Sequence, residues 1–337
     1  TITSGTVTKS IGLSTVGGVL TNNGEVIIHG RGDSSNIGIF LNNQIYGGTS
    51  VSSSGVLGST SSIKVTGDNS TGILIDGGAN LNYAGSTTVE GNGISGIVVT
   101  GNSTVTGTAA GTLSVNKGSG LASGLGKSGS YGMVVKNGST FDNDKVNVDI
   151  NVTSKESIGL YSDGTLKIGN HAVKADNGAV NYFSDNRGVL TLSGTGTSTT
   201  GQKSLLFYSE SNGKFDLNNV TARIKGGTNA GDRGTAFYYQ GTGGSINATA
   251  IENYIKNMLN NTQGQLTLDM ESGSRLFILD NVAVDLSSAA GAVGSLGINF
   301  TPTSTDYKTY MMYKSSLGID QNIDLDSASD AYNALEI

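Results

Sequence analysis

Residues that could carry out acid–base chemistry are scarce in this chain. There are only two histidines, His29 at the end of an apolar run and His171 after a Gly-Asn turn. A general base needs a positioned partner, and the sequence indicates none for either histidine. We therefore interpret both as residues of a surface or of the edge of a repeated coil, and we expect no catalytic residue.

Carboxylates are the next candidates for chemistry because they form two groups that are close in sequence. The groups are Asp142, Asp144 and Asp149, and Asp320, Asp324 and Asp326. A glycosidase needs two carboxylates at a fixed separation, one of them with a pKa raised by burial. Asp-rich turns on a solvated face are the commoner origin of such groups. We expect no enzyme, and keep a polysaccharide-acting hydrolase or lyase on a β-helix as the alternative.

Motifs for bound ions and cofactors are missing as well. The chain has 0 cysteines, which excludes disulfides and thiolate metal sites. The segment 226–232 departs from the glycine- and aspartate-rich nonapeptide that binds calcium. No phosphate-binding glycine-rich motif is present. We therefore expect no metal and no cofactor.

One tripeptide has a known binding role in other proteins. Arg31-Gly32-Asp33 is the sequence that integrins recognise on loops. Motifs this short often occur by chance, so we keep it only as an alternative binding motif.

A repeated phrase must position any functional side chain. It consists of a small residue, several β-formers and a polar turn, and its copies recur about every 25 residues. The clearest copies are 36–43, 70–77, 95–101, 131–138 and 158–164. In the later copies we place Gly178, Leu205 and Gly234 at the position of the glycine. A strand-based repeat with variable loops is typical of a β-solenoid.

The phrase also predicts which side chains face inward. The residue after the glycine is always a large apolar one: Ile39, Ile73, Ile97, Met133 and Leu160. Strand alternation then points the next residue outward. That outward column is Phe40, Leu74, Val98, Val134 and Tyr161, which is apolar where polar residues are expected.

One segment has helical rather than strand periodicity. In residues 249–261 the apolar residues Ile251, Ile255, Met258 and Leu259 share one face of an amphipathic helix. We predict β-helix coils over 1–248, a helical insertion over 249–262, and further coils over 263–337 that are truncated at the C-terminus.

The composition limits the class of partner. The net charge is −6 and only 14% of the 337 residues are charged, so a nucleic-acid partner is not expected. No run of apolar residues is long enough to span a membrane as a helix. We expect a monomer that is not inserted in a membrane.

The tandem phrase Ser-x-Gly-Ile, as at 70–77 and 95–101, resembles the passenger region of bacterial type V autotransporters. The form at 158–164 is similar to the long fusobacterial outer-membrane adhesins. The resemblance implies an all-β, right-handed parallel β-helix that is exposed on the bacterial cell surface or released from it. It also implies that this chain is a fragment of a longer passenger that acts as an adhesin. No functional residue is carried over, because the shared phrase is scaffold.

Aromatic residues give the most specific functional hypothesis. Exposed aromatic rings supply contact area at low entropic cost. The candidate ligand-binding residues are Tyr161, Tyr182, Phe207, Tyr208, Phe237 and Tyr238, and the polar stretch 117–130 is a second candidate contact loop. We expect an adhesin that binds a host-cell glycan or receptor protein, or another bacterium. A passive stalk that spaces a distal tip is the other alternative.

Overall fold

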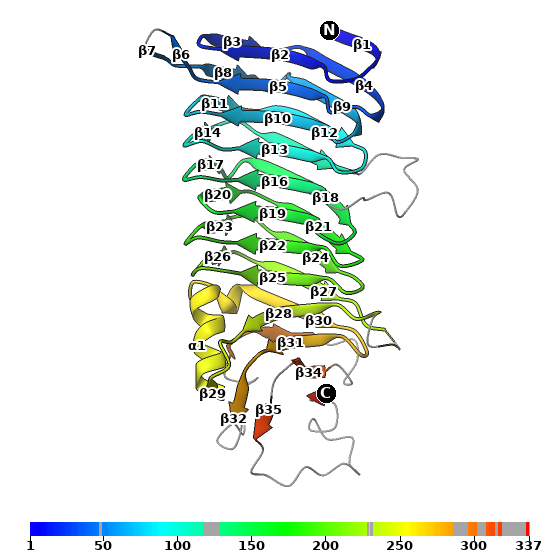
Figure 1. Cartoon of the computed structure of the whole chain (residues 1–337), viewed down its shortest axis with the longest axis vertical. Helices are drawn as coiled ribbons and strands as arrows, with labels where there is room; N and C mark the ends of the chain where they lie inside the picture. The colour runs from blue at the N-terminus through cyan, green and yellow to red at the C-terminus, as the bar shows by residue number, and fades with distance from the viewer. Residues whose placement is uncertain are drawn as a thin grey trace.

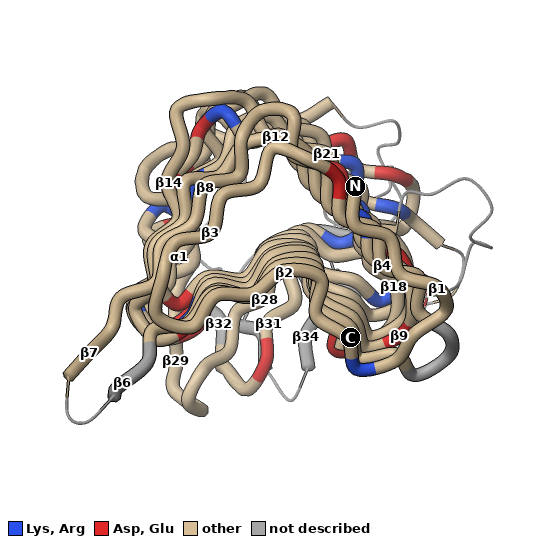
Figure 2. The backbone as a smooth tube through the Cα atoms, turned by 90° about the horizontal axis from the view of Figure 1, so that it is seen from above, with Lys and Arg blue, Asp and Glu red and all other residues tan. Residues whose placement is uncertain are grey.

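The computed structural model of the chain describes residues 1–46, 49–116, 129–227, 229, 232–285, 296–301, 308–313, 316–318 and 335–336. These residues form a rod of stacked coils, with the N-terminus at one end (Figure 1). Successive coils contribute strands to three parallel sheets, which we call sheets A, B and C and which contain 11, 12 and 8 described strands. The coils stack in register around one axis and run clockwise away from the N-terminal end, so the β-helix is right-handed (Figure 2). The predicted fold class is confirmed.

The described strands of the three sheets are as follows. Sheet A contains β1 (Ile2–Val7), β4 (Glu25–Asp33), β9 (Ser62–Asp68), β12 (Gly85–Glu90), β15 (Gly111–Val115), β18 (Val146–Thr153), β21 (His171–Asp176), β24 (Gly196–Thr200), β27 (Val220–Ile224), β30 (Leu266–Met270) and β33 (Asn299–Phe300). Sheet B contains β2 (Ile11–Val16), β5 (Ile37–Asn42), β10 (Thr71–Asp76), β13 (Ser95–Val99), β16 (Tyr131–Val135), β19 (Ile158–Ser162), β22 (Val180–Ser184), β25 (Leu205–Ser209), β28 (Thr235–Gln240), β31 (Arg275–Asp280), β34 (Lys308–Tyr313) and β36 (Leu335–Glu336). Sheet C contains β3 (Val19–Asn22), β8 (Ser54–Leu57), β11 (Asn80–Tyr83), β14 (Thr104–Thr106), β17 (Thr140–Asn143), β20 (Thr165–Ile168), β23 (Val189–Leu192) and β26 (Lys214–Leu217).

Smaller elements complete the described part of the chain. A short parallel sheet contains β29 (Ser245–Asn247), β32 (Ala283–Asp285) and β35 (Ser316–Gly318). An antiparallel hairpin contains β6 (Gln44–Tyr46) and β7 (Thr49–Val51). The helices are α1 (Ala248–Met258) and the 3-10 turn η2 (Gln263–Gln265).

Each well-formed copy of the phrase turns two consecutive positions inward. In β10, Gly72 and Ile73 are both buried, whereas Leu74 is partly exposed. Glycine is required at the first position, because a Cβ there would lie 2.5 Å from the carbonyl oxygen of Gly96. The predicted inward ladder is confirmed, since its members are all buried: Ile39, Ile73, Ile97, Met133 and Leu160.

Aromatic side chains continue this inward ladder toward the C-terminal end. Tyr182 pairs with Leu160, and Phe207 pairs with both Tyr182 and Phe237. All three aromatic residues are fully buried. The ring centroids of Phe207 lie 5.3 Å from Tyr182 and 5.8 Å from Phe237. The prediction that Tyr182, Phe207 and Phe237 lie on the outward surface is therefore wrong, because they stack inside the core.

Other residues occupy the glycine position in these later coils. The predicted occupants were Gly178, Leu205 and Gly234, but strand pairing places different residues there, and all of them are buried. They are Asn181, Leu206 and Ala236. A shift of one residue in register moves a side chain to the opposite face of a strand. The register differs by an odd number of residues at Asn181 and Leu206, which explains why Tyr182 and Phe207 were assigned to the surface.

Helix α1 confirms the predicted insertion. Its N-terminus is capped by Asn247, whose side-chain oxygen accepts a hydrogen bond from the Ala250 backbone nitrogen at 2.9 Å. Its apolar face, which includes Ile251 and Ile255, is buried in the core. The helix lies beyond β26, next to the C-terminal end of sheet C (Figure 1). It therefore forms a wall beside the last coils of sheet B.

Candidate functional site

One outward side chain per strand forms a continuous column on sheet B. Strand pairing aligns Phe40, Leu74, Val98, Val134, Tyr161, Phe183 and Tyr208. Tyr238 continues the column, since its ring centroid lies 5.5 Å from that of Tyr208. We call the four partly exposed aromatic residues of this column the aromatic strip: Tyr161, Phe183, Tyr208 and Tyr238.

The rings of the aromatic strip contact one another from coil to coil. The ring centroids lie 5.1 Å apart for Tyr161 and Phe183, and 4.7 Å apart for Phe183 and Tyr208. Tyr161, Tyr208 and Tyr238 were predicted as binding residues, and the structure brings them together on one face. Phe183 was missed, although strand alternation in register with Tyr161 would have identified it.

A second outward column runs beside the aromatic strip, two residues further along each strand. Its acidic members, which we call the carboxylate column, are Asp163, Asp185, Glu210 and Asp280. The hydroxyl of Tyr208 donates to Glu210, and the hydroxyl of Tyr238 donates to Asp280 Oδ2 at 2.5 Å. The tyrosine hydroxyls are thus held toward the carboxylates, so the two columns form one surface.

Among the described residues no cation lies within salt-bridge distance of the carboxylate column, although the charge of Lys136 acts on Asp163. Among the residues that the structure describes, no lysine, arginine or histidine forms an ion pair with any of the four carboxylates. Burial raises the pKa of Asp163; a hydrogen bond from the Asn137 backbone and the charge of Lys136 partly oppose this rise, and the charge of Asp185 adds a smaller increase. A cation contacts the strip at Tyr161, where the Nζ of Lys136 lies 5.2 Å from the ring centroid.

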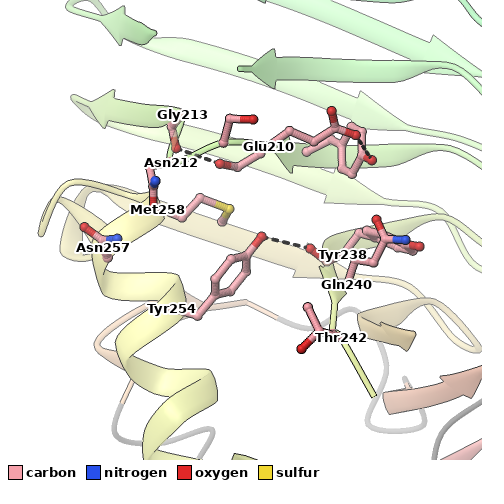
Figure 3. Close-up of a pocket in the computed structure, with 13 residues that line it drawn as sticks. Glu210, Asn212, Gly213, Tyr238, Gln240, Thr242, Tyr254, Asn257 and Met258 are labelled. Atoms are coloured by element: carbon pink, nitrogen blue, oxygen red, sulfur yellow. Dashed lines mark hydrogen bonds between the residues drawn. The ribbon is translucent and has the colours of Figure 1, made fainter. Parts of the chain in front are cut away.

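A pocket of about 450 Å³ lies where the aromatic strip meets α1 (Figure 3). Its lining is Tyr208, Ser209, Glu210, Ser211, Asn212, Gly213, Tyr238, Gln240, Gly241, Thr242, Tyr254, Asn257 and Met258. The hydroxyl of Tyr254 on α1 donates to the Tyr238 carbonyl oxygen at 3.1 Å, which ties the helix to the strand. The pocket thus combines aromatic rings with amides, hydroxyls and one carboxylate.

No protein-family model, curated protein or solved structure matches this chain. The fold and the site are therefore supported by the geometry of the chain itself. No helix in the described ranges is long and apolar enough to cross a membrane. Nor do the described residues contain three or more His, Asp or Glu side chains grouped so that they could hold a metal ion.

A second pocket of about 460 Å³ opens on the side of sheet A. Its lining is Asn151, Thr153, Lys174, Asp176, Asn177, Gly201, Gln202, Lys225 and Gly226. Lys225 is already engaged, because its Nζ lies 2.9 Å from Glu271 Oε1. This pocket contains no aromatic residue and one carboxylate, so it is the weaker candidate for recognition.

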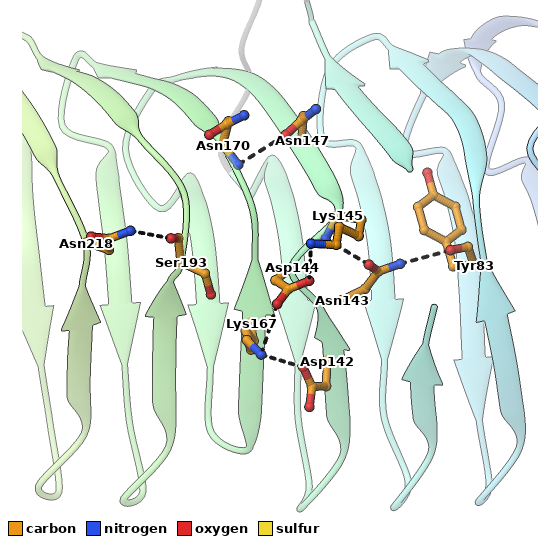
Figure 4. A network of polar contacts seen from close by, with 10 residues as sticks. All are labelled: Tyr83, Asp142, Asn143, Asp144, Lys145, Asn147, Lys167, Asn170, Ser193 and Asn218. Atoms are coloured by element: carbon orange, nitrogen blue, oxygen red, sulfur yellow. Dashed lines mark hydrogen bonds and ion pairs between the residues drawn. The ribbon is translucent and has the colours of Figure 1, made fainter. Parts of the chain in front are cut away.

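The candidate carboxylates of the sequence do not form one site. Asp142 on β17 and Asp144 in the following turn each lie 3.4 Å from Lys167 Nζ (Figure 4). Lys145 and Lys167 lower the pKa of Asp144. Asp149 lies on β18 in sheet A. The group 320–326 and the loop 117–128 lie outside the described residues.

The structure also places the integrin-type tripeptide and the histidine His171. Arg31-Gly32-Asp33 forms the C-terminal end of β4. His171, expected at a surface or coil edge, lies in the core with 5% of its surface exposed, so that prediction is wrong. Its ring is edge-on to Tyr182, and neither ring nitrogen has a hydrogen-bond partner. Burial lowers the pKa of His171 to about 4.

Proposed function

We propose that this chain is a non-enzymatic binding module of a bacterial surface adhesin of the autotransporter type. In this proposal the outer face of sheet B contacts a receptor on a host cell or on another bacterium, and the pocket beside α1 is the main contact. The observation that carries the proposal is the aromatic strip, which leads into a tyrosine-lined pocket. Contiguous exposed apolar surface in a soluble protein is typical of a contact site.

The scaffold suits recognition because it holds these rings rigidly. Each ring is attached to a strand that is hydrogen-bonded on both sides, and each also contacts the ring of a neighbouring coil. Tyrosine has few rotatable bonds, so little side-chain entropy is lost when it binds a partner. A pre-organised strip of this kind can bind without remodelling the coils.

The alternatives predict different behaviour. A hydrolase or lyase needs two carboxylates in one cleft, whereas Glu210 is the only carboxylate in the lining of the pocket beside α1. No observation on the described residues favours that reaction, and we do not propose it. A passive stalk would not require the aromatic strip. Substitution of the strip therefore distinguishes the stalk hypothesis from the adhesin hypothesis.

The test is binding of the purified chain to host and bacterial cells, measured by flow cytometry. We expect the double variant Tyr208→Ala/Tyr238→Ala to lose most binding. Tyr131→Ala, which removes a partly exposed tyrosine from another column of sheet B, should bind normally. Thermal unfolding of each variant checks that it is folded. Unchanged binding by the folded double variant would refute the adhesin proposal and favour the stalk.

Oxidation of the cell surface with periodate identifies the class of receptor. Periodate cleaves vicinal diols of sugars and leaves most of the protein surface intact. Loss of binding after oxidation would indicate a glycan receptor, and preserved binding would indicate a protein receptor.

A further inference from the structure

The electrostatics of the strip indicate the charge of its partner. Asp163, Asp185 and Glu210 follow consecutive strands of sheet B, so their backbones are about 4.8 Å apart. Like charges at neighbouring positions of adjacent strands are destabilising. Several acidic residues elsewhere are paired with a cation, as Glu271 is with Arg223 at 2.6 Å. A cation supplied from outside would relieve the repulsion in the carboxylate column.

The tyrosines beside these carboxylates are suited to the same charge. A cation above an aromatic face is attracted by the negative potential of the ring. Hydrogen bonds to Glu210 and Asp280 make the rings of Tyr208 and Tyr238 more electron-rich. Lys136 already shows that a lysine ammonium can sit on the strip, because it lies over the ring of Tyr161.

The pocket beside α1 repeats this chemistry with space for a ligand. Tyr208 and Tyr238 supply ring surface, and Glu210 supplies the charge. The amide oxygens of Asn212 and Gln240 add neutral acceptors for an ammonium group, which has three protons to donate. Arg187, in the turn after Asp185, forms no salt bridge with any described carboxylate.

We propose that the aromatic strip and its pocket bind lysine side chains on a basic segment of a partner protein. This inference rests on the proposed adhesin function and specifies its receptor. The ammonium groups contact the tyrosine rings and the carboxylate column, and one lysine enters the pocket beside α1. Binding should weaken when salt is added, because Glu210 is exposed and the other groups are partly exposed to solvent.

The test uses a fluorescein-labelled peptide in which lysines alternate with glycines, measured by fluorescence anisotropy with the whole chain. The matched peptide carries acetylated lysines, which keep the shape and lose the charge. We expect only the unmodified peptide to bind, and Glu210→Gln to weaken that binding about two- to fivefold. Glu90→Gln, which removes one charge at the end of β12 in sheet A, should have no effect.

For a second variant we expect tighter rather than weaker binding of the peptide. Lys136→Met removes the cation that lies over Tyr161, so it should strengthen peptide binding about two- to fivefold by freeing that ring. This variant keeps the test valid even if Glu210→Gln disturbs the local fold.

Each outcome has a distinct meaning. Equal binding of the two peptides, or no binding of either, would refute the inference. Tighter binding of an oligomer of glucosamine than of the lysine peptide would refute a protein partner and indicate an amino sugar. If the chain binds cells through Tyr208 and Tyr238 but not the lysine peptide, the proposed function stands and this inference fails. If the chain binds no cells, the proposed function fails.

Discussion

Acidification should destabilise this β-helix through one buried histidine. His171 is nearly enclosed by the core, and burial of its ring lowers its pKa from 6.5 to about 4. Above pH 6.5 the ring is neutral in the folded and unfolded chains, so the folded state keeps its full stability. As the pH falls from 6.5 toward 4, the unfolded chain binds a proton that the folded chain does not, and stability is lost.

The size of the effect follows from the pKa difference. At about 1.4 kcal/mol per unit, the shift corresponds to a loss of about 3 kcal/mol once the pH is below 4. Between about pH 7.5 and about pH 5 the expected loss is about 2 kcal/mol. This interval lies above the ordinary pKa values of Asp and Glu. The raised pKa of Asp163 acts in the opposite direction, because the folded chain then binds the proton more readily.

The assay is urea unfolding followed by circular dichroism at both pH values. His171→Leu should abolish most of the pH-dependent loss, because the apolar side chain cannot bind a proton. His29→Gln, which changes the exposed histidine, should keep the wild-type loss. If His171→Leu loses as much stability between the two pH values as the wild type does, the reasoning is refuted.

Two further predictions concern the interior of the coils. Phe207→Ala should lower the free energy of unfolding by about 3–5 kcal/mol, because it leaves a cavity between the stacked rings of Tyr182 and Phe237; a loss below 1 kcal/mol in urea titration would contradict its place in the core. Gly72→Ala should cost about 1–3 kcal/mol, because the new methyl group meets the Gly96 carbonyl oxygen. Gly5→Ala, where nothing lies within 4 Å, is its control, and equal thermal stability of the two variants would contradict the steric argument.

The fold could be predicted from the sequence because the same phrase recurs and each copy has the same physical task. A glycine followed by a large aliphatic residue, as in Gly72-Ile73, can be recognised in the sequence alone, without knowledge of distant contacts. The helix was predictable for the same reason, since its apolar periodicity is local. The prediction failed where the glycine was replaced, as at Asn181, because the register then depends on pairing with the coil before it.

The candidate site was predictable only in part. Tyr161 follows from strand alternation after Gly159, whereas Tyr208 points outward only in the register that pairing with β22 sets. The carboxylate column requires the register of several coils at once, because Asp163 and Glu210 are neighbours of the strip only after stacking. The pocket requires the docking of α1 against β28, where Tyr254 meets Tyr238. No local pattern specifies that contact.

The separation of inward and outward columns on sheet B has a consequence for how such a chain can change over generations. The inward ladder must keep its shape, whereas the outward neighbour of most rungs is partly exposed and contacts the outward residues of the adjacent coils. Phe40, Leu74 and Tyr161 already occupy equivalent positions with very different side chains. Mutations can therefore change the outward residues of one coil at a time while the core stays the same. Duplication of a coil would lengthen the surface in the same way.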